Sequence, residues 1–254
     1  MKYELYPCFN WPGTIWLYSD PHFGDEELYT YRGTSSSIND DEQVRRINSK
    51  VGKNDTIVIL GDVGSVEWVK KIRGYKVLIL GNHDSGASKY KRSIKDFTVP
   101  ISNLDFEFIK TFDKGDIKNS KIMDTEFIEV DDHLFDEVYT GCLMINEKII
   151  LSHEPVEFMY AFNIHGHDHS GADFIKYVLS EYDSDIASKN MSKVYLETVS
   201  KNKLNKLNVC AEWIGYYPVC LSQIIKSGAL SSIPNIHRIT IDAATERKQK
   251  KQSC

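Results

Sequence analysis

Residues 76–84 read KVLILGNHD, and this stretch decides the fold. Its first five residues form a short apolar run that stops at Gly81, and such a run bounded by a turn predicts a buried strand. Asn82, His83 and Asp84 follow at once, so the strand delivers polar side chains at its carboxyl end. Ligands bind at that edge in the sheets of α/β proteins. The stretch therefore predicts both a strand and part of a site.

The same arrangement occurs four more times along the chain. Apolar runs at 14–18, 56–60, 148–151 and 162–164 are followed by SDPH (19–22), GD (61–62), SH (152–153) and HGHDH (165–169). Their nearly continuous hydrophobicity is typical of strands in a sheet that is covered on both faces. Because such strands end at one edge of the sheet, we expect the polar side chains that follow them to lie close together.

Helical spacing is found between these strands. Asp40 is placed to cap a first helix and Ser65 to cap a second. The apolar residues that recur at helical spacing are Val44, Ile47 and Val51 in the first helix and Val66, Val69 and Ile72 in the second. Strands that alternate with helices predict an α/β fold.

The rest of the chain is less regular. We expect strands at 106–111 and 121–130, and a solvated acidic loop that contains Asp131, Asp132, Asp136 and Glu137. The polar segment 173–206 is interpreted as an insertion with helical character, followed by a last strand at 207–209. We expect one domain over residues 1–230 and a polar tail over 231–254 that frays.

Composition narrows the class of protein. Hydrophobic residues make up 41% and charged residues 26% of the 254 positions, which is typical of a soluble globular domain with a sizeable core. No apolar run has the length of a membrane span, and the first residues do not resemble a signal peptide. The five cysteines are scattered and odd in number, which favours reduced thiols in the cytoplasm. The net charge of −5 argues against a broad surface for nucleic acid.

Each polar stretch is weak evidence by itself, since Gly-Asp is usually a turn and Asp-x-His arises by chance. All five in this order predict a metal site. Mixed imidazole and oxygen ligands favour manganese, iron, zinc or nickel over calcium or magnesium. One carboxylate has two oxygens and can lie between two cations. Two cations about 3.5–4 Å apart can activate water and bind phosphoryl oxygens.

The ordered series Asp20-x-His22, Gly61-Asp62, residues 81–84 (GNHD), His153 and Gly166-His167-x-His169 resembles the calcineurin-like metallophosphoesterases, over residues 14–225. The stretches at 19–24 (SDPHFG) and 215–219 (GYYPV) are similar to a compact branch found in bacteria and phages. The resemblance implies a four-layer α/β/β/α fold, in which a β-sandwich is flanked by helices. It also implies hydrolysis of phosphomonoesters, phosphodiesters or nucleotides.

The resemblance implies a role for each matching residue. Asp20, His22 and His169 would hold one divalent cation. Asn82, His153 and His167 would hold a second, with Asp62 bridging the two. Manganese is the first expectation for both, followed by iron, zinc or nickel.

His83 matches the family's general acid, which protonates the leaving alkoxide. The alternative is that His83 only hydrogen-bonds the substrate phosphate. Many relatives carry Gly-Asp-x-x-Asp, whose second Asp orients this histidine, but here Ser65 stands in its place. Another carboxylate would then have to orient His83, or its acid role would be weak and the enzyme would favour good leaving groups.

Several neighbouring residues are interpreted as structural. Asp84 is expected to stabilise its own turn, His165 to lie outside the ligand set, and Tyr18 and Phe23 to pack in the core. The lysines at 193, 201, 203 and 206 are read as a solvated face. Lys89, Lys91, Arg92 and Lys95 are read in the same way, and His133 and His237 as surface residues.

Three hypotheses for function remain open at this point. The first is a phosphoesterase that acts on a small phosphorylated substrate or nucleotide. The second is a metal-dependent nuclease, which strongly salt-dependent binding to single strands would reveal. The third is a metal-binding scaffold without catalysis, for which a missing ligand would be the first sign.

Overall fold

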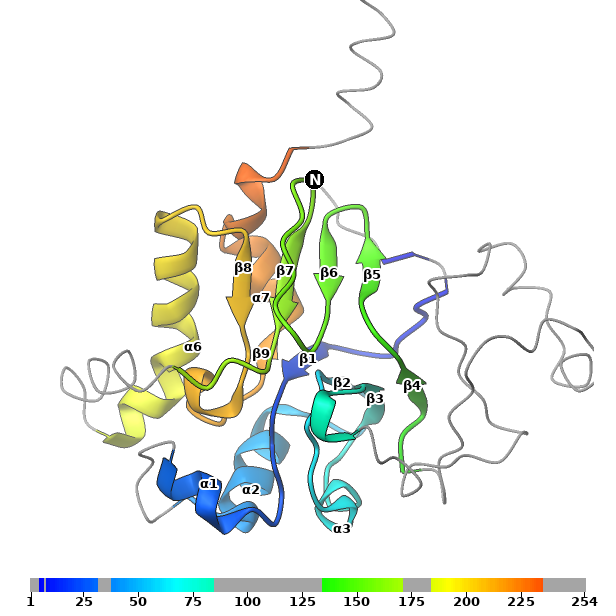
Figure 1. Cartoon of the computed structure of the whole chain (residues 1–254), viewed down its shortest axis with the longest axis vertical. Coiled ribbons are helices and arrows are strands. Elements are labelled where there is room, and N and C mark those ends of the chain that lie inside the picture. Colours follow the sequence, from blue (N-terminus) through cyan, green and yellow to red (C-terminus); the bar gives the residue numbers. More distant parts are fainter. Residues whose placement is uncertain (1–4, 7, 32–37, 85–133, 171–183, 235–254) are drawn as a thin grey trace, which may run out of the picture.

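The computed structural model describes residues 5–6, 8–31, 38–84, 134–170 and 184–234, which form two β-sheets and the helices around them (Figure 1). The five-stranded sheet has the order β4-β3-β2-β1-β9, and the four-stranded sheet has the order β5-β6-β7-β8. The strands of the first sheet are β1 (Ile15–Tyr18), β2 (Thr56–Ile59), β3 (Tyr75–Ile79), β4 (Glu137–Tyr139) and β9 (Val219–Cys220). Those of the second are β5 (Leu143–Asn146), β6 (Ile149–Leu151), β7 (Phe162–His165) and β8 (Lys206–Asn208). All five strands predicted at metal-ligand stretches are present.

Parallel pairing sets the common edge in each sheet. β1, β2, β3 and β4 run parallel in the first sheet, and β9 is antiparallel to β1. β6, β7 and β8 run parallel in the second. The two sheets meet beyond β1 and β8, where Ser19 and Cys210 form a bridge and Ala211 N donates to Ser19 O at 3.0 Å. Strands that belong to different sheets therefore end near the same place.

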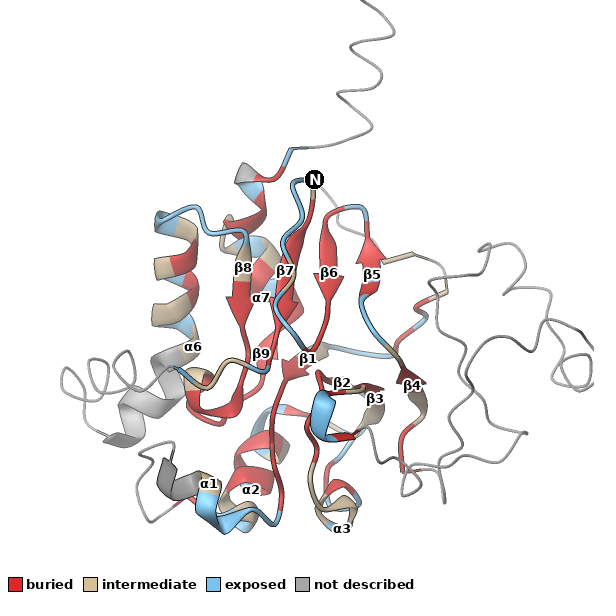
Figure 2. Ribbon diagram, viewed as in Figure 1, coloured by how far each residue is buried: buried red, intermediate tan, exposed pale blue. Residues whose placement is uncertain are grey.

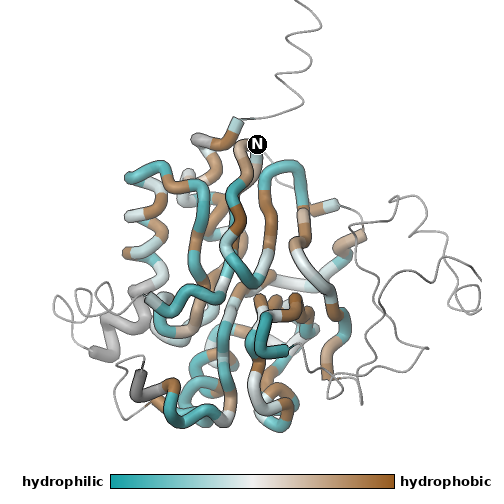
Figure 3. Tube along the Cα trace, viewed as in Figure 1, coloured by the Kyte–Doolittle hydropathy of each residue, from teal (hydrophilic) through white to brown (hydrophobic). Residues whose placement is uncertain are grey.

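The core lies between and around the sheets. Leu17, Ile57, Leu78, Leu151 and Ile164 are all 0% exposed and belong to one buried apolar cluster. Figure 2 shows the strands of both sheets as almost wholly buried, and Figure 3 shows that they are mainly apolar. Burial on both sides of each strand explains the continuous hydrophobic runs in the sequence. The predicted α/β sandwich flanked by helices is confirmed.

The described helices cover the sheets. Figure 1 shows α1, α2 and α3 on one side of the five-stranded sheet and the four-stranded sheet on the other. The helices are α1 (Glu26–Tyr31), α2 (Asp40–Lys50), α3 (Val66–Val69), α6 (Ser184–Lys201) and α7 (Leu221–Lys226), with short 3-10 turns η1 (Asn82–Asp84), η5 (Ala211–Ile214) and η6 (Ala229–Ser232). The polar segment 173–206 contains α6 and is followed by β8, one residue earlier than predicted.

The two predicted helix starts need correction. Asn39, and not Asp40, caps α2, because Asn39 Oδ1 accepts a hydrogen bond from Glu42 N at 2.9 Å. The Asp40 carboxylate instead accepts from Gly24 N at 2.9 Å. Ser65 does occupy the N-cap position of α3, but its side chain makes no capping hydrogen bond. The helix is four residues long.

The prediction for Glu137 was wrong. It lies in β4 and not in a solvated loop, and its carboxylate accepts hydrogen bonds from Trp11 Nε1 at 2.8 Å, Tyr75 OH at 2.8 Å and Tyr139 OH at 2.6 Å. Three donors offset the cost of removing the carboxylate from water. Asp136 Oδ2 likewise accepts from Lys76 N at 2.7 Å.

Several predictions cannot be compared with the structure. Asp131, Asp132, the strands expected at 106–111 and 121–130, the basic residues at 89–95, His133 and His237 lie outside the described residues. The domain boundary at residue 230 also stays a prediction. Among the described helices, none is both long and apolar enough to cross a membrane.

Two arginines on α2 bind the carboxylate of Glu42, and we expect this contact to stabilise the fold in a pH-dependent way. Arg46 is 8% exposed, donates to Gly215 O at 3.0 Å and lies over the Tyr217 ring. Its Nε donates to Glu42 Oε1 at 2.7 Å, and Arg45 donates to both oxygens of the same carboxylate at 2.6 Å. The hydrogen bonds from Arg45, with those from Arg46, lower the pKa of Glu42 from 4.5 to about 2 although burial opposes them.

Glu42→Gln is therefore expected to lower the free energy of unfolding at pH 7 by about 1–3 kcal/mol. Since the pKa of Glu42 is lower in the folded state, this contribution is complete above pH 4.5 and is lost as the pH falls toward 2. Urea unfolding of both proteins at pH 7, 4 and 2.5 measures it. Glu67→Gln, in the exposed pair with Lys70, is the control and should change little. A difference that stays constant with pH would contradict the assignment.

Candidate metal centre

The structure brings all seven predicted ligands to one place at the carboxyl ends of five strands. Asp20 and His22 follow β1, Asp62 follows β2 and Asn82 follows β3. His153 follows β6, and His167 and His169 follow β7. Residues from both sheets contribute because the two sheets meet at this edge.

Asp20, His22 and His169 form a first group, whose candidate ligand atoms all lie within 4.8 Å of one another. Asp20 Oδ1 is 3.4 Å from His169 Nε2 and 3.8 Å from His22 Nε2. Asp20 is 0% exposed, and its other oxygen accepts from His167 N at 2.9 Å. Burial opposes ionisation of this carboxyl, but contacts with His169 and His22 outweigh it and hold the pKa well below its usual range. Asp20 is therefore an ionised carboxylate in the folded protein.

His153, His167 and Asn82 form a second group next to Asp62. Asn82 Oδ1 is 2.7 Å from His153 Nε2 and 3.1 Å from His167 Nδ1. The two ring nitrogens are 3.2 Å apart. The candidate ligand atoms of Asp62, His153 and His167 also all lie within 4.8 Å of one another, so they could surround one ion.

Asp62 lies between the two groups. Its Oδ2 is 3.5 Å from His22 Nε2, which belongs to the first group, and 3.4 Å from His153 Nε2, which belongs to the second. Its Oδ1 accepts a hydrogen bond from His83 N at 2.9 Å. One carboxylate oxygen thus faces both groups while the other is fixed by the next loop.

The tautomers of two histidines fit cations at these positions. His153 Nδ1 is 2.8 Å from Leu60 O and His169 Nδ1 is 2.6 Å from Glu212 Oε1, and both oxygens can only accept hydrogen bonds. In the neutral rings Nε2 therefore carries a lone pair, which for His153 faces the Asn82 oxygen. Two lone pairs at 2.7 Å need a positive charge beside them. His22 Nε2 is also buried without a hydrogen bond among the described residues.

The backbone is strained at four of the seven residues. Asp20, His22, Asp62 and His167 have positive φ angles of 55°, 45°, 54° and 67°. This left-handed region is costly for residues other than glycine and is found mainly at functional sites. Gly81 and Gly166 allow the loops to approach closely, because a side chain at either would collide with Asp62 or with Ser19 and Asp20.

Asp84 fixes two of these loops together. It is 0% exposed and accepts from Gly81 N at 2.9 Å, as predicted for its own turn. It also accepts from Asp62 N at 2.8 Å and Val63 N at 3.1 Å, and so ties the loop after β2 to the loop after β3.

His83 lies at the exposed rim of the centre, with its ring centroid 5.4 Å from that of His22. Within the described ranges, no carboxylate hydrogen-bonds the His83 ring. Of the two alternatives raised by Ser65, an orienting carboxylate is therefore not found there, which leaves a weak acid role for the described part of the chain.

Three residues near the centre behave as predicted from their types. His165 is 4% exposed on β7, its Nδ1 donates to Gly166 O at 2.8 Å, and it belongs to neither group. Burial lowers the pKa of His165 and favours its neutral form. Tyr18 and Phe23 are packed, with Tyr18 OH donating to Gln43 and Phe23 stacked on Trp68.

Sequence reasoning missed Glu212. This residue is 2% exposed in η5, and its Oε1 accepts from His169 Nδ1 at 2.6 Å. Cys210, two residues earlier, donates its thiol to Asp20 Oδ2 at 3.1 Å. Both follow β8, so the rule that polar residues after a strand mark the site would have found them had it been applied to the last strand.

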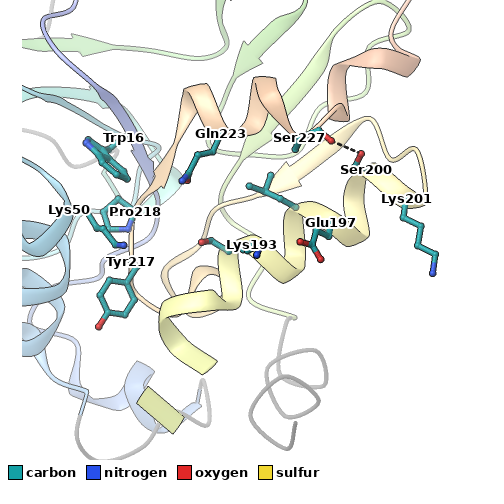
Figure 4. A pocket seen from close by; sticks show the side chains of 12 residues that line it. Trp16, Lys50, Lys193, Glu197, Ser200, Lys201, Tyr217, Pro218, Gln223 and Ser227 are labelled. Carbon is teal, nitrogen blue, oxygen red and sulfur yellow. Dashed lines mark hydrogen bonds between the residues drawn. The ribbon is translucent and has the colours of Figure 1, made fainter. Parts of the chain in front are cut away.

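A separate cavity of about 630 Å³ lies between α6 and the segment that carries Tyr217 and Gln223 (Figure 4). Lys193 and Lys201 are exposed at its wall, in agreement with a solvated face. None of the seven candidate ligands lines it.

Two curated phage proteins are similar to part of this chain. The "Gene 66 protein" of Mycobacterium phage L5 is 28% identical over 173 residues, covering 61% of this chain and 77% of the relative. The protein of the same name from Mycobacterium phage D29 is 26% identical over 170 residues, covering 61% and 78%.

Two solved structures show distant similarity. A protein of unknown function from Aquifex aeolicus has 18% identity and a TM-score of 0.46, covering 84% of this chain and 98% of that chain. The nuclease MPE of Pseudomonas putida has 17% identity and a TM-score of 0.34, covering 60% of each. Neither bears on the activity of this chain.

A family model decides the family to which the chain belongs. The family model described as calcineurin-like phosphoesterase matches residues 13–187, which is more than half of the 254 positions. This range contains all seven candidate ligands and His83. The chain therefore belongs to the calcineurin-like phosphoesterase family.

Proposed function

We propose that this protein is a dinuclear metal-dependent phosphoesterase that hydrolyses a small phosphorylated substrate or a nucleotide. Asp20, His22 and His169 hold one divalent cation, and Asn82, His153 and His167 hold the other. The observation that carries the proposal is the position of Asp62, whose Oδ2 lies 3.5 Å from His22 Nε2 and 3.4 Å from His153 Nε2. A single carboxylate oxygen so placed can bridge two cations.

The donor set of imidazoles, carboxylates and one amide suits manganese first, and iron, zinc or nickel next. Two such cations supply a water of lowered pKa and positive charge for the phosphoryl oxygens. The chain holds the ligands in place through Asp84, Gly81 and Gly166, so little reorganisation is required when substrate binds.

Exposure indicates the side from which substrate approaches. Asp20 and His22 are buried, whereas Asn82, His83 and His167 are exposed. A phosphate group therefore enters beside the second group of ligands. A leaving group next to that opening lies near His83, which donates a proton to the departing alkoxide.

The cysteines favour the cytoplasm as the place of action. Cys8, Cys142, Cys210 and Cys220 form no disulfide in the described part of the chain. Reduced thiols are typical of that compartment.

Metal analysis combined with a substrate panel tests the proposal. We expect two divalent ions per chain after loading with manganese, loss of turnover on chelation, and recovery when manganese is returned. The panel contains an aryl phosphate monoester, an aryl diester, a cyclic nucleotide and short single-stranded oligonucleotides. Fewer than two ions at saturation, or no turnover of any substrate by the loaded protein, would overturn the proposal. Turnover of oligonucleotides alone would identify a nuclease.

A further inference from the structure

The two groups of ligands differ in charge. Asp20 contributes a carboxylate to the first group, and the Glu212 carboxylate lies 2.6 Å from His169 of that group. The second group consists of Asn82, His153 and His167, none of which is an anion. Asp62 is shared between them. Among the unshared ligands and the groups hydrogen-bonded to their rings, the first position therefore has two carboxylates and the second has none.

The Nδ1 atoms of His169 and His153, which face away from the proposed cations, show the same difference in charge between the two groups. His169 Nδ1 donates to the Glu212 carboxylate at 2.6 Å, whereas His153 Nδ1 donates to the neutral Leu60 carbonyl at 2.8 Å. A carboxylate behind a histidine ligand fixes its tautomer and makes its other nitrogen more basic. Because Glu212 is only 2% exposed, solvent screens this effect little.

Glu212 is itself held firmly. Ala211 N, the preceding residue, donates to Ser19 O at 3.0 Å. On the other side, Trp213 Nε1 donates to Asp168 O at 2.9 Å, and Asn208 Nδ2 donates to the same oxygen at 2.7 Å. The segment from Asn208 to Trp213 thus fixes the loop that carries His169 and places Glu212 behind it.

We propose that Glu212 is a positioning residue that makes the two cation positions unequal. The position at Asp20, His22 and His169 fills first and retains its ion, and the position at Asn82, His153 and His167 fills at higher metal concentration. Activity then follows occupancy of the second, weaker position. This inference rests on the proposed function, since it assumes that both positions bind cations.

The test is a titration of manganese into the metal-free protein with its full sequence. Calorimetry measures the affinity of each binding step, and electron paramagnetic resonance shows whether the bound ions are isolated or coupled. The wild type should bind one ion in a tight step that gives an isolated-ion spectrum and a second in a weaker step that gives a coupled spectrum. Glu212→Gln should weaken the tight step by about 10–100-fold and leave the weaker step unchanged, so that the steps approach each other. Glu197→Gln, an exposed change on α6, is the matched control and should not alter the isotherm.

Two further variants separate the effect of the Glu212 charge from that of the His169 loop, and the first metal position from the second. Trp213→Phe removes one hydrogen bond to the His169 loop without changing charge, and the two steps should stay apart. Asn82→Ala removes an exposed ligand of the second position, so the tight binding step should persist alone. This variant tests the inference independently of whether Glu212→Gln folds.

The outcomes distinguish this inference from the proposed function. Two ions bound in one class of equal sites, an unchanged tight step in folded Glu212→Gln, or loss of the tight step in Asn82→Ala would overturn the inference alone. Fewer than two ions in the saturated wild type would overturn the proposed function.

Discussion

Asp62→Asn will reduce kcat/KM for phosphate esters by about 10³-fold or more, which corresponds to about 4 kcal/mol of transition-state stabilisation. The substitution changes one atom at the point where the two groups of ligands meet. Asp62 Oδ2 lies 3.5 Å from His22 Nε2 and 3.4 Å from His153 Nε2. In asparagine the group at that position is an amide NH₂, which has no lone pair available to donate to a cation.

The fold should survive this change. Asparagine tolerates the left-handed conformation that Asp62 adopts at φ 54°. Its amide oxygen can still accept the hydrogen bond from His83 N, which is 2.9 Å from Asp62 Oδ1. The hydrogen bond from the backbone N of residue 62 to Asp84 involves no side-chain atom of residue 62. The loss of activity should therefore be a loss of metal binding and not of structure.

Asp55→Asn is the matched control, because it makes the same chemical change just before the other end of β2. Asp55 accepts from Thr14 N and Gly52 N at 2.9 Å and is not among the candidate ligands. We expect this variant to lose some stability and to keep its turnover. Circular dichroism, metal content and kinetics on an aryl phosphate are measured for both. Unchanged turnover in folded Asp62→Asn would contradict the bridging role.

The strands and most of the site were predictable because both depend on local patterns. A short apolar run bounded by a turn, such as 77–80, is typical of a strand buried on both faces, and neighbouring parallel strands end at one edge of their sheet. Seven side chains that follow such strands were therefore brought together. The sequence could also place helix α2, whose Val44, Ile47 and Val51 are buried as their spacing predicts.

The errors concern polar residues whose partners are distant in sequence. Glu137 resembled part of a solvated acidic loop, yet its nearest donors include Trp11, which is 126 residues away. Glu212 carries no motif, and its role arises only because His169, 43 residues earlier, points its Nδ1 at it. Local spacing holds no information on such pairs. Asn39 is a different case, since neighbouring Asn and Asp are both good caps and only the backbone decides between them.

His83→Ala will separate substrates by their leaving groups. For alkyl phosphates, whose leaving group needs a proton, kcat/KM should fall by about 10²–10⁴-fold. For activated aryl phosphates it should change little, because their leaving groups depart as stable anions. A plot of log kcat/KM against the pKa of the leaving group should accordingly be shallow for the wild type and steep for the variant.

The position of His83 supports this expectation. Its side chain is exposed at the opening, with the ring centroid 5.4 Å from that of His22, and its backbone N–H donates to Asp62 Oδ1 at 2.9 Å. Alanine retains that backbone hydrogen bond, and the variant should therefore keep its metal content. Loss of metal would show that the effect does not come from the proton.

Asn82→Ala provides the comparison, because removing a proposed ligand should slow good and poor leaving groups alike. If His83 only hydrogen-bonds the phosphate, His83→Ala will behave in the same way, and the acid role is wrong. The family pattern adds a further expectation, since Ser65 stands where many relatives carry the Asp that orients this histidine. Since no carboxylate hydrogen-bonds the ring in the described ranges, we expect the loss for alkyl phosphates in His83→Ala to lie nearer the lower end of that range, about 10²-fold.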